Sequence, residues 1–187
     1  MGEGKKMVII INGKGGSGKD TICDILNKHY PVTNISTITK VKQAARLIFG
    51  WDGRTKSDAD RKFLSDLKDL WTKYNDGPFK YAMDQYWKFI DKPEAAYKEI
   101  LVIHVREPQE IEKLKKAIDH GGYVRCVTLL VKSDRTEEHD YGNHADDMVE
   151  DYPYNYVYHN DGALEDLDQN FMRFFHTVMV PSWQESH

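Results

Sequence analysis

Cysteine is scarce in this chain of 187 residues, which contains only Cys23 and Cys126. Two cysteines so far apart are too few for a disulfide framework or a cysteine-based zinc site. Long hydrophobic runs are also missing, and no apolar stretch approaches the ~20 residues that span a membrane. Lys5 and Lys6 precede only a few apolar residues, so nothing resembles a secretory signal peptide. We therefore expect a cytoplasmic protein without a membrane-spanning segment.

An excess of positive charge is absent as well, because 26 basic and 30 acidic residues give a formal net charge of -4. Proteins that bind nucleic acid or membrane surfaces usually carry a broad basic face. We therefore expect neither partner, while local basic clusters still allow small nucleotide ligands. The length suits one domain over residues 1–187, large enough for a sheet covered by helices on both faces.

Short apolar runs alternate with longer helical patterns along the chain. The predicted strands are residues 8–11, 35–38, 100–105, 124–131 and 154–158. Apolar residues at helical spacing predict helices over residues 41–48, 64–74, 111–118 and 164–178. Strands that alternate with helices form right-handed βαβ units. We therefore expect an α/β fold with an open parallel sheet, helices on both faces, and ligands at the carboxyl ends of the strands.

A glycine-rich segment follows the first predicted strand directly. Gly13, Gly18 and Lys19 fit the pattern G-x-x-x-x-G-K. Such a loop wraps backbone N–H groups around nucleotide phosphates and leads into a helix whose N-terminus favours anions. We expect the lysine to reach the β- and γ-phosphates, and Asp20 stands where a serine or threonine usually binds magnesium. The predicted phosphate-binding residues are Gly13, Lys14, Gly15, Gly16, Ser17, Gly18, Lys19, Asp20 and Thr21.

A basic cluster lies between the second and third predicted strands, in a helical region over about residues 39–92. Lys42 and Arg46 are four residues apart and would share one face of a helix. A kinase needs cations for its anionic acceptor as well as for its donor. The predicted acceptor-binding residues are Lys42, Arg46, Arg54 and Lys56. The alternative for any one of them is an ordinary exposed side chain.

Two further arginines follow predicted strands. Arg106 would emerge near the phosphate loop and stabilise charge during transfer, and its alternative is an exposed arginine at the start of a helix. Arg135 belongs to a polar segment over about residues 132–147, which we expect to fold over the nucleotide as a short lid. His139 and His144 lack metal-ligand spacing, and we interpret them as surface residues.

The loop sequence from Gly13 to Asp20 resembles that of P-loop kinases whose phosphate loop ends in Gly-Lys-Asp. The resemblance is closest to deoxynucleoside monophosphate kinases of phage type, which are adenylate-kinase-like, and animal-type phosphomevalonate kinases share the loop pattern. Three more stretches are similar to the nucleotide kinases. They are Lys42 with Ala44, Ala45 and Phe49-Gly50-Trp51; Val105-Arg106-Glu107-Pro108 with Glu110, Ile111 and Gly121-Gly122; and Asp151-Tyr152-Pro153 with Asn160-Asp161-Gly162.

The resemblance implies a P-loop kinase that transfers the γ-phosphoryl group of ATP to a nucleoside or deoxynucleoside monophosphate, with Mg²⁺ required. It places Lys42 in the acceptor site, and Asp20 or Thr21 on the magnesium ion or its waters. An aspartate near a triphosphate is repelled without a cation, which favours magnesium bridging. The implied catalytic residues are Lys19, Arg106 and Arg135.

One position departs from the family pattern. The resemblance places an aspartate two residues before Arg106, where this chain has His104. Either a shifted acid takes over that role, or the protein binds nucleotide and transfers phosphate poorly. Three functions therefore stay open: a nucleoside monophosphate kinase, a kinase of another small phosphorylated acceptor such as phosphomevalonate or dephospho-coenzyme A, and a non-catalytic ATP-binding regulator. The absence of an Asn-Lys-x-Asp signature disfavours a GTPase.

Overall fold

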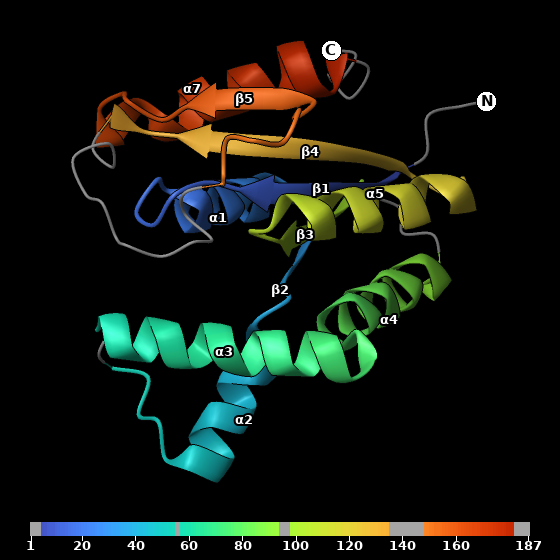
Figure 1. The fold of residues 1–187 in the computed structure, drawn as a ribbon. Coiled ribbons are helices and arrows are strands. Elements are labelled where there is room, and N and C mark those ends of the chain that lie inside the picture. Colours follow the sequence, from blue (N-terminus) through green and yellow to red (C-terminus); the bar gives the residue numbers. More distant parts are fainter. Residues whose placement is uncertain (1–4, 55–56, 94–97, 135–147, 182–187) are drawn as a thin grey trace.

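The computed structural model describes residues 5–54, 57–93, 98–134 and 148–181. Its centre is a five-stranded parallel sheet in the order β2-β3-β1-β4-β5 (Figure 1). The strands are β1 (Lys6–Asn12), β2 (Val32–Ser36), β3 (Glu99–His104), β4 (Arg125–Lys132) and β5 (Tyr156–His159). Because β1 lies in the middle of the sheet, its apolar run is buried on both faces.

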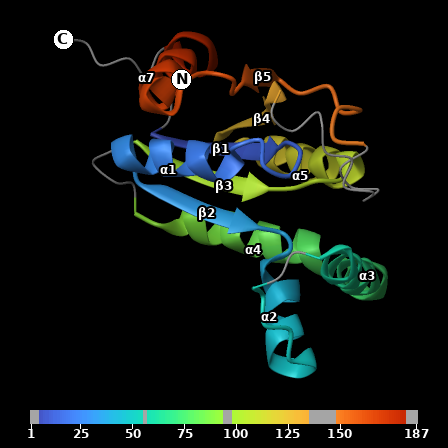
Figure 2. The ribbon, with the colours of Figure 1, turned by 90° about the vertical axis from the view of Figure 1, so that its left-hand side faces the viewer.

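Helices cover both faces of this sheet (Figure 2). Successive strand residues point to opposite faces, so Ile9 of β1 packs with α1 and α7, while Ile10 packs with α4 and α5. The predicted open parallel sheet with helices on both faces is thereby confirmed. The covering helices are α1 (Lys19–His29), α4 (Gly77–Asp91), α5 (Pro108–Gly121) and α7 (Leu167–Phe174).

Two more helices, α2 (Thr39–Phe49) and α3 (Asp58–Asn75), lie beside the sheet, and α2 projects away from the body of the molecule (Figure 2). The helix α4, which follows them, was not predicted as a separate element. Asp76 separates α3 from α4 with a φ of 60°. The next residue must be small, since a Cβ on Gly77 would lie 1.9 Å from the indole of Trp71.

The second predicted strand, residues 35–38, is shifted. The strand β2 ends at Ser36, and the backbone N–H and the hydroxyl of the next residue, Thr37, both donate to the carbonyl oxygen of His104, at 3.2 and 3.4 Å. The chain then turns into α2 two residues later. This turn brings the start of α2 to the carboxyl end of β3.

The last predicted strand, residues 154–158, begins two residues late. The side chain of Asn155 takes the place of a strand partner, because its Oδ1 accepts from the backbone N–H of Thr128 at 2.9 Å. Regular pairing with β4 therefore starts at Tyr156.

The C-terminal helix predicted over residues 164–178 consists of three segments. A 3-10 turn, η2 (Leu164–Asp166), leads into α7, and a π-helical turn, η3 (Phe175–Met179), follows it. Of the predicted lid, only residues 132–134 lie within the described part of the chain. None of the helices in the described ranges combines the length and the apolar character needed to cross a membrane.

Candidate functional site

The glycine-rich loop connects β1 to α1 at the carboxyl edge of the sheet, as predicted (Figure 1). Two of its glycines are required by their surroundings. A Cβ on Gly13 would lie 2.4 Å from the carbonyl oxygen of Val131, and one on Gly18 would lie 2.2 Å from Nδ2 of Asn160. Gly18 also has a φ of 93°, which side chains rarely adopt. The loop is therefore packed tightly between β4 and the segment after β5.

Lys19 is the first residue of α1, and its side chain folds back over the loop. Its Nζ donates to the carbonyl oxygens of Gly13 and Lys14, at 2.6 and 2.8 Å. A cation held at this point, next to a helix N-terminus, provides the positive field that a phosphate group needs. The geometry thus suits the predicted role of Lys19.

Two asparagines that the sequence did not single out as site residues fix the loop from both ends. Asn12 accepts from the backbone N–H of Gly13 at 2.8 Å, and its Nδ2 donates to the Arg106 carbonyl and to the Tyr154 hydroxyl. Asn160 donates to the carbonyl oxygen of Ser17 at 3.0 Å. The position of Asn12 directly before the first glycine is the one signal in the sequence that points to its role.

Asp20 and Thr21 occupy the first turn of α1, and both are exposed. A carboxylate and a hydroxyl are hard oxygen ligands of the kind that Mg²⁺ prefers. Within the described ranges, no group of three or more His, Cys, Asp or Glu is arranged to hold a metal ion. The two residues therefore fit a magnesium ion whose remaining ligands are phosphate oxygens and water.

His104, at the end of β3, lies at the centre of the charged groups. Burial lowers its pKa from 6.5 to about 4, because an imidazolium ion is poorly solvated there. Asp20 opposes this shift, while Lys19, Lys42 and Arg106 reinforce it. Its Nε2 lies 3.4 Å from Sγ of Cys23, whose pKa burial raises to about 12. His104 is therefore neutral at pH 7.

The charged side chains that influence the pKa of His104 come from several of the predicted site segments. Lys42 comes from the first turns of α2, Arg106 from the residue pair after β3, and Lys19 and Asp20 from the loop end. These four charged side chains are close enough to shift the same pKa. The donor and acceptor residues predicted from separate segments therefore meet at one edge of the sheet.

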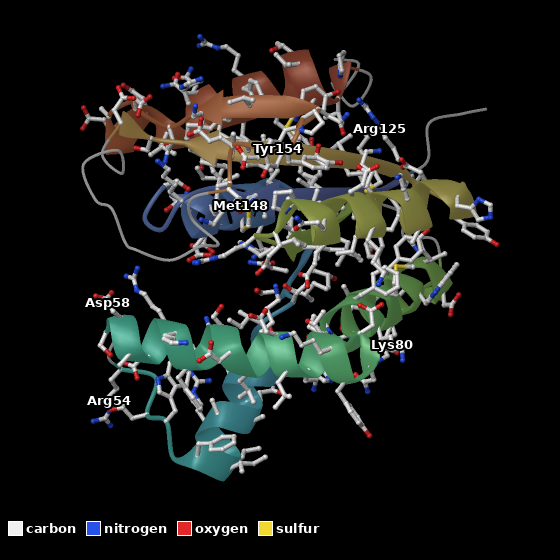
Figure 3. All side chains as sticks on the ribbon, in the orientation of Figure 1. Arg54, Asp58, Lys80, Arg125, Met148 and Tyr154 are labelled. Carbon is white, nitrogen blue, oxygen red and sulfur yellow. The ribbon has the colours of Figure 1, made fainter. Side chains whose placement is uncertain are left out.

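The other predicted acceptor residues have different surroundings. Arg46 lies one turn farther along α2, where its guanidinium stacks over Trp51 at 5.3 Å. Arg54 is exposed in the loop between α2 and α3, and Figure 3 shows it beside the start of α3. The described contacts of both residues thus lie toward the far end of α2. Lys56 and Arg135 fall outside the described residues, as do His139 and His144.

A buried ion cluster next to Arg106 was not anticipated. Lys68 of α3 is only 5% exposed and donates to Glu107 and Glu110 at the start of α5, the latter at 2.8 Å. Burial alone would raise the pKa of Glu107, but the Lys68 charge outweighs it and lowers that pKa. Burial raises the pKa of Glu110, and Lys68 offsets this only in part. The cluster ties the helical region to the strand end that carries Arg106.

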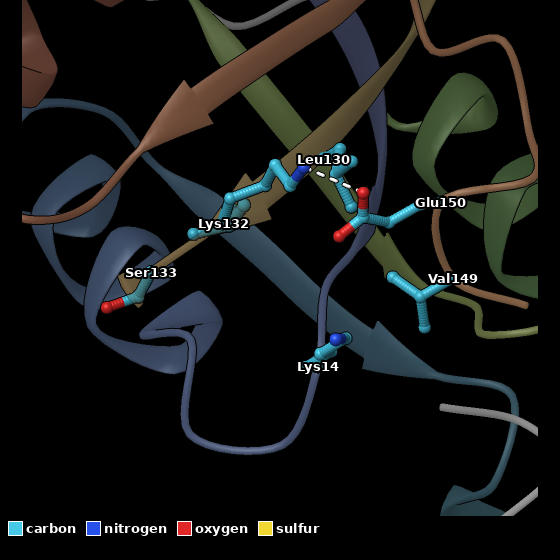
Figure 4. Close-up of a pocket in the computed structure, with 7 residues that line it drawn as sticks. Lys14, Leu130, Lys132, Ser133, Val149 and Glu150 are labelled. Atoms are coloured by element: carbon cyan, nitrogen blue, oxygen red, sulfur yellow. Dashed lines mark hydrogen bonds and ion pairs between the residues drawn. The ribbon is translucent and has the colours of Figure 1, made fainter. Parts of the chain in front are cut away.

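A small hollow lies on the other side of the loop, between Lys14 and the end of β4 (Figure 4). Its volume is about 10 Å³, which is room for one water molecule. Next to it, Lys132 and Glu150 form an ion pair of 2.7 Å. This pair joins the two described ends of the chain on either side of residues 135–147, which make up most of the segment predicted as a lid, residues 132–147.

Comparison with known proteins finds similar folds. No family model matches the chain, and neither does any curated protein. The solved structure of APE1195 has a TM-score of 0.50 and 15% identity, with 99% of each chain covered. TT1252 from Thermus thermophilus has a TM-score of 0.48 and 19% identity, covering 92% of this chain and 98% of that one. A thymidylate kinase from Ehrlichia chaffeensis has a TM-score of 0.40 and 15% identity, covering 96% and 99%. At these identities the likeness concerns the fold alone.

Proposed function

We propose that this protein transfers the γ-phosphoryl group of ATP to a nucleoside or deoxynucleoside monophosphate. The observation that carries the proposal is that the segments of Lys19, Lys42 and Arg106 adjoin at the strand ends. Lys19 lies over the loop, Asn12 joins the Arg106 carbonyl to the first glycine of the loop, and a hydrogen bond to the His104 carbonyl holds the turn that leads into α2. Two anionic substrates must approach each other during phosphoryl transfer, so cations are needed on both sides of the reacting phosphorus. The loop provides one cation, and α2 and the end of β3 provide the others.

In this proposal Lys19 holds the β- and γ-phosphates, Lys42 holds the acceptor phosphate, and Arg106 neutralises charge on the group in transit. An oxygen of the acceptor phosphate forms a bond to the γ-phosphorus while the bond between the γ-phosphorus and the bridging oxygen of ATP breaks. The products are ADP and a nucleoside diphosphate. Asp20 and Thr21 would hold magnesium, which screens the phosphate charges when it is bound. Arg135, outside the described residues, is proposed as a further catalytic cation.

The state of His104 supports a phosphate rather than a hydroxyl group as the acceptor. A hydroxyl acceptor is usually activated by a base, and a histidine with a pKa of about 4 is a weak one. A phosphate monoester has its second pKa near ~6, so at pH 7 it is already largely a dianionic nucleophile. This reasoning favours nucleoside monophosphates or phosphomevalonate over dephospho-coenzyme A, which accepts through a hydroxyl. The resemblance of the segments around Lys42 and Arg106 favours the nucleotides.

An acceptor panel tests the proposal. Each nucleoside and deoxynucleoside monophosphate, phosphomevalonate and dephospho-coenzyme A is incubated with magnesium-ATP, and ADP formation is measured. We expect turnover with at least one nucleotide and none with dephospho-coenzyme A. Normal ATP binding without turnover on any nucleotide would contradict the proposal, and turnover on phosphomevalonate alone would reassign the acceptor.

A non-catalytic ATP-binding regulator is the second candidate, and it is favoured by the histidine at position 104. It predicts that ATP raises the melting temperature while no acceptor yields ADP. The variant His104→Asp separates the two candidates, because it restores the acid of the family pattern among three cations. If the wild-type protein is inactive and this variant gains turnover that His104→Asn lacks, the histidine is what disables transfer.

A further inference from the structure

The imidazole of His104 lies against the first turns of α1. His104 is the last residue of β3, and it pairs in register with Ile11 of β1, two residues before the first glycine of the loop. Its side chain extends to the α1 side of the sheet, because Nε2 lies 3.4 Å from Sγ of Cys23. Cys23 follows Lys19 by about one helical turn. The ring is therefore placed at the strand ends, directly beside the phosphate loop.

The other ring nitrogen of His104, Nδ1, is accessible to a ligand. It makes no hydrogen bond to any residue that the structure describes. In the described ranges, the buried side-chain nitrogen and oxygen atoms without a partner belong to Ser17, Tyr86, Glu99 and Asn160, and Nδ1 is not among them. Solvent therefore reaches Nδ1, and a ligand in the site can take the place of that solvent.

The charges that act on the ring are mostly positive. Lys19, Lys42 and Arg106 each lower the pKa of His104, and Asp20 opposes them. Three cations and one carboxylate give these surroundings a net positive charge, which attracts an anion such as a phosphate group. A ligand that reaches Nδ1 is therefore expected to be anionic.

The contact with Cys23 decides which ring nitrogen carries the proton. An imidazole is mostly neutral above pH 7 even at its ordinary pKa, so one nitrogen donates and the other accepts. A thiol is protonated at this pH, since it ordinarily loses its proton only near pH ~8.5. Sulfur is a weak acceptor, and the unprotonated ring nitrogen is a better one. The better pairing is therefore the thiol of Cys23 donating to Nε2, which leaves the ring proton of His104 on Nδ1.

We propose that His104 is a phosphate ligand, whose Nδ1 donates a hydrogen bond to a phosphate oxygen while the thiol of Cys23 donates to Nε2. The phosphate is either the γ-phosphate of ATP or the phosphate of the acceptor, and both are anionic. An aspartate at this position would repel either group without a cation between them, whereas a neutral N–H attracts it. The inference rests on the proposed function for the substrates that the site binds, and it does not depend on turnover.

Isothermal titration calorimetry on two amide variants tests which nitrogen binds phosphate. The Nδ2 atom of an asparagine takes nearly the position of Nδ1 in histidine, while the amide of a glutamine extends toward the position of Nε2. We expect His104→Asn to keep its affinity within about threefold and His104→Gln to lose at least about tenfold, the value of one hydrogen bond to a charged group. Equal affinities of the two variants, or a loss in His104→Asn alone, would overturn the proposal.

Three kinds of ligand in these titrations identify the source of the phosphate. The β,γ-imido analogue of ATP with magnesium carries a γ-phosphate, ADP with magnesium lacks it, and each of the four deoxynucleoside monophosphates carries the acceptor phosphate. A loss in His104→Gln with the analogue but not with ADP assigns Nδ1 to the γ-phosphate, and a loss with a monophosphate assigns it to the acceptor. No loss with any ligand, or a loss with ADP as large as with the analogue, would overturn the proposal. Turnover enters none of these results, so this inference and the proposed function can fail separately.

Nitrogen NMR of protein with ¹⁵N-labelled histidine reads the tautomer directly, because protonated and unprotonated ring nitrogens have different chemical shifts. The signals of His104 are those that His104→Asn lacks. With the ligand that the titrations select bound at pH 7.5, we expect the proton on Nδ1, and a proton on Nε2 would overturn the proposal.

Variants of Cys23 test its role as a positioning residue. Cys23→Ser keeps a donor and should keep the proton of His104 on Nδ1, whereas Cys23→Ala should give a mixture of tautomers. Cys126→Ala is the matched control, since Cys126 is also buried but packs in the core on the other face of the sheet. Thermal melts verify that all variants fold. A single, unchanged tautomer in Cys23→Ala would overturn the role of the thiol.

Discussion

The donor side of the candidate site and the helical region on its acceptor side are built in different ways. The phosphate loop follows β1, whose Val8, Ile9 and Ile10 are completely buried between two neighbouring strands. Asn12 holds the loop by accepting from the backbone N–H of Gly13, and Asn160 holds it by donating to the carbonyl oxygen of Ser17. On the proposed acceptor side, the long side chain of Lys42 extends from a helix whose core with α3 has three buried residues.

The two sides of the site have different requirements. The ATP phosphates are bound in the same way whichever acceptor is used, so a firmly held loop does not restrict the choice of acceptor. The core between α2 and α3 is smaller than the two cores that flank the sheet, so the position of α2 depends on fewer buried contacts. The neighbouring helix α3 is joined to the start of α5 by the Lys68 cluster, which is both buried and ionic.

The largest expected effect is on the donor side. Lys19→Ala removes the ammonium group that lies over the loop, and we expect kcat to fall by about 10²–10³-fold, as for the loss of one strong electrostatic contact in a transition state. Steady-state kinetics on the best acceptor measures this loss. The matched control is Lys28→Met on the same helix, whose exposed side chain pairs with Asp168 and should leave activity unchanged. A loss below tenfold would argue against a rigid, lysine-dependent donor side.

The next effect concerns the junction of the two regions. Lys68→Met leaves Glu107 and Glu110 without their cation, and we expect a loss of about 3 kcal/mol in the free energy of unfolding. Lys62→Met, on the same helix, breaks an exposed pair with Asp66 and should cost no more than about 0.5 kcal/mol. Urea melts measure both. Equal losses in the two variants would show that burial gives the Lys68 cluster no special weight.

The pH dependence of stability isolates His104. Unfolded histidine binds a proton near pH 6.5, whereas His104 in the folded protein does so only near pH 4. The unfolded state therefore gains protons first as the pH falls, and this residue should lower stability by about 2 kcal/mol between pH 7 and pH 5. Urea melts of His104→Asn should show a shallower pH dependence by that amount. Parallel curves for the two proteins would mean that folding leaves the pKa of His104 unshifted.

The smallest effect is expected from the acceptor side. Lys42→Ala should raise the KM of the acceptor about tenfold, the value of one charged contact, and leave the KM of ATP nearly unchanged. Lys40→Ala is the control, since Lys40 lies on the other side of α2, where its Nζ is 5.7 Å from the centre of the Tyr81 ring. Initial rates with either substrate varied separate the two constants. An equal rise in both would show that Lys42 serves the donor as well.

Local patterns predicted much of the fold. The apolar run of β1 and the glycines that follow it placed the strand, the loop and the start of α1 correctly. The prediction for β2 began three residues late and ended two residues late, and the prediction for β5 began two residues early and ended one residue early. In both cases a side chain bonds across the sheet, Thr37 to His104 and Asn155 to Thr128, and such a bond leaves no trace in the apolar pattern.

The sequence by itself determined the open α/β sheet, the phosphate loop and the departure at position 104. Each of these features depends on the spacing of residues within a short stretch of the chain, so it can be read without knowing which distant residues come together. Only the tertiary structure decided that Asn160 holds Ser17 across 143 residues and that Lys68 is buried against α5. It also decided that Lys42, and not the far end of α2, comes to His104. Such contacts arise from the order and twist of the strands, and they join residues whose separation in sequence gives no hint that they meet.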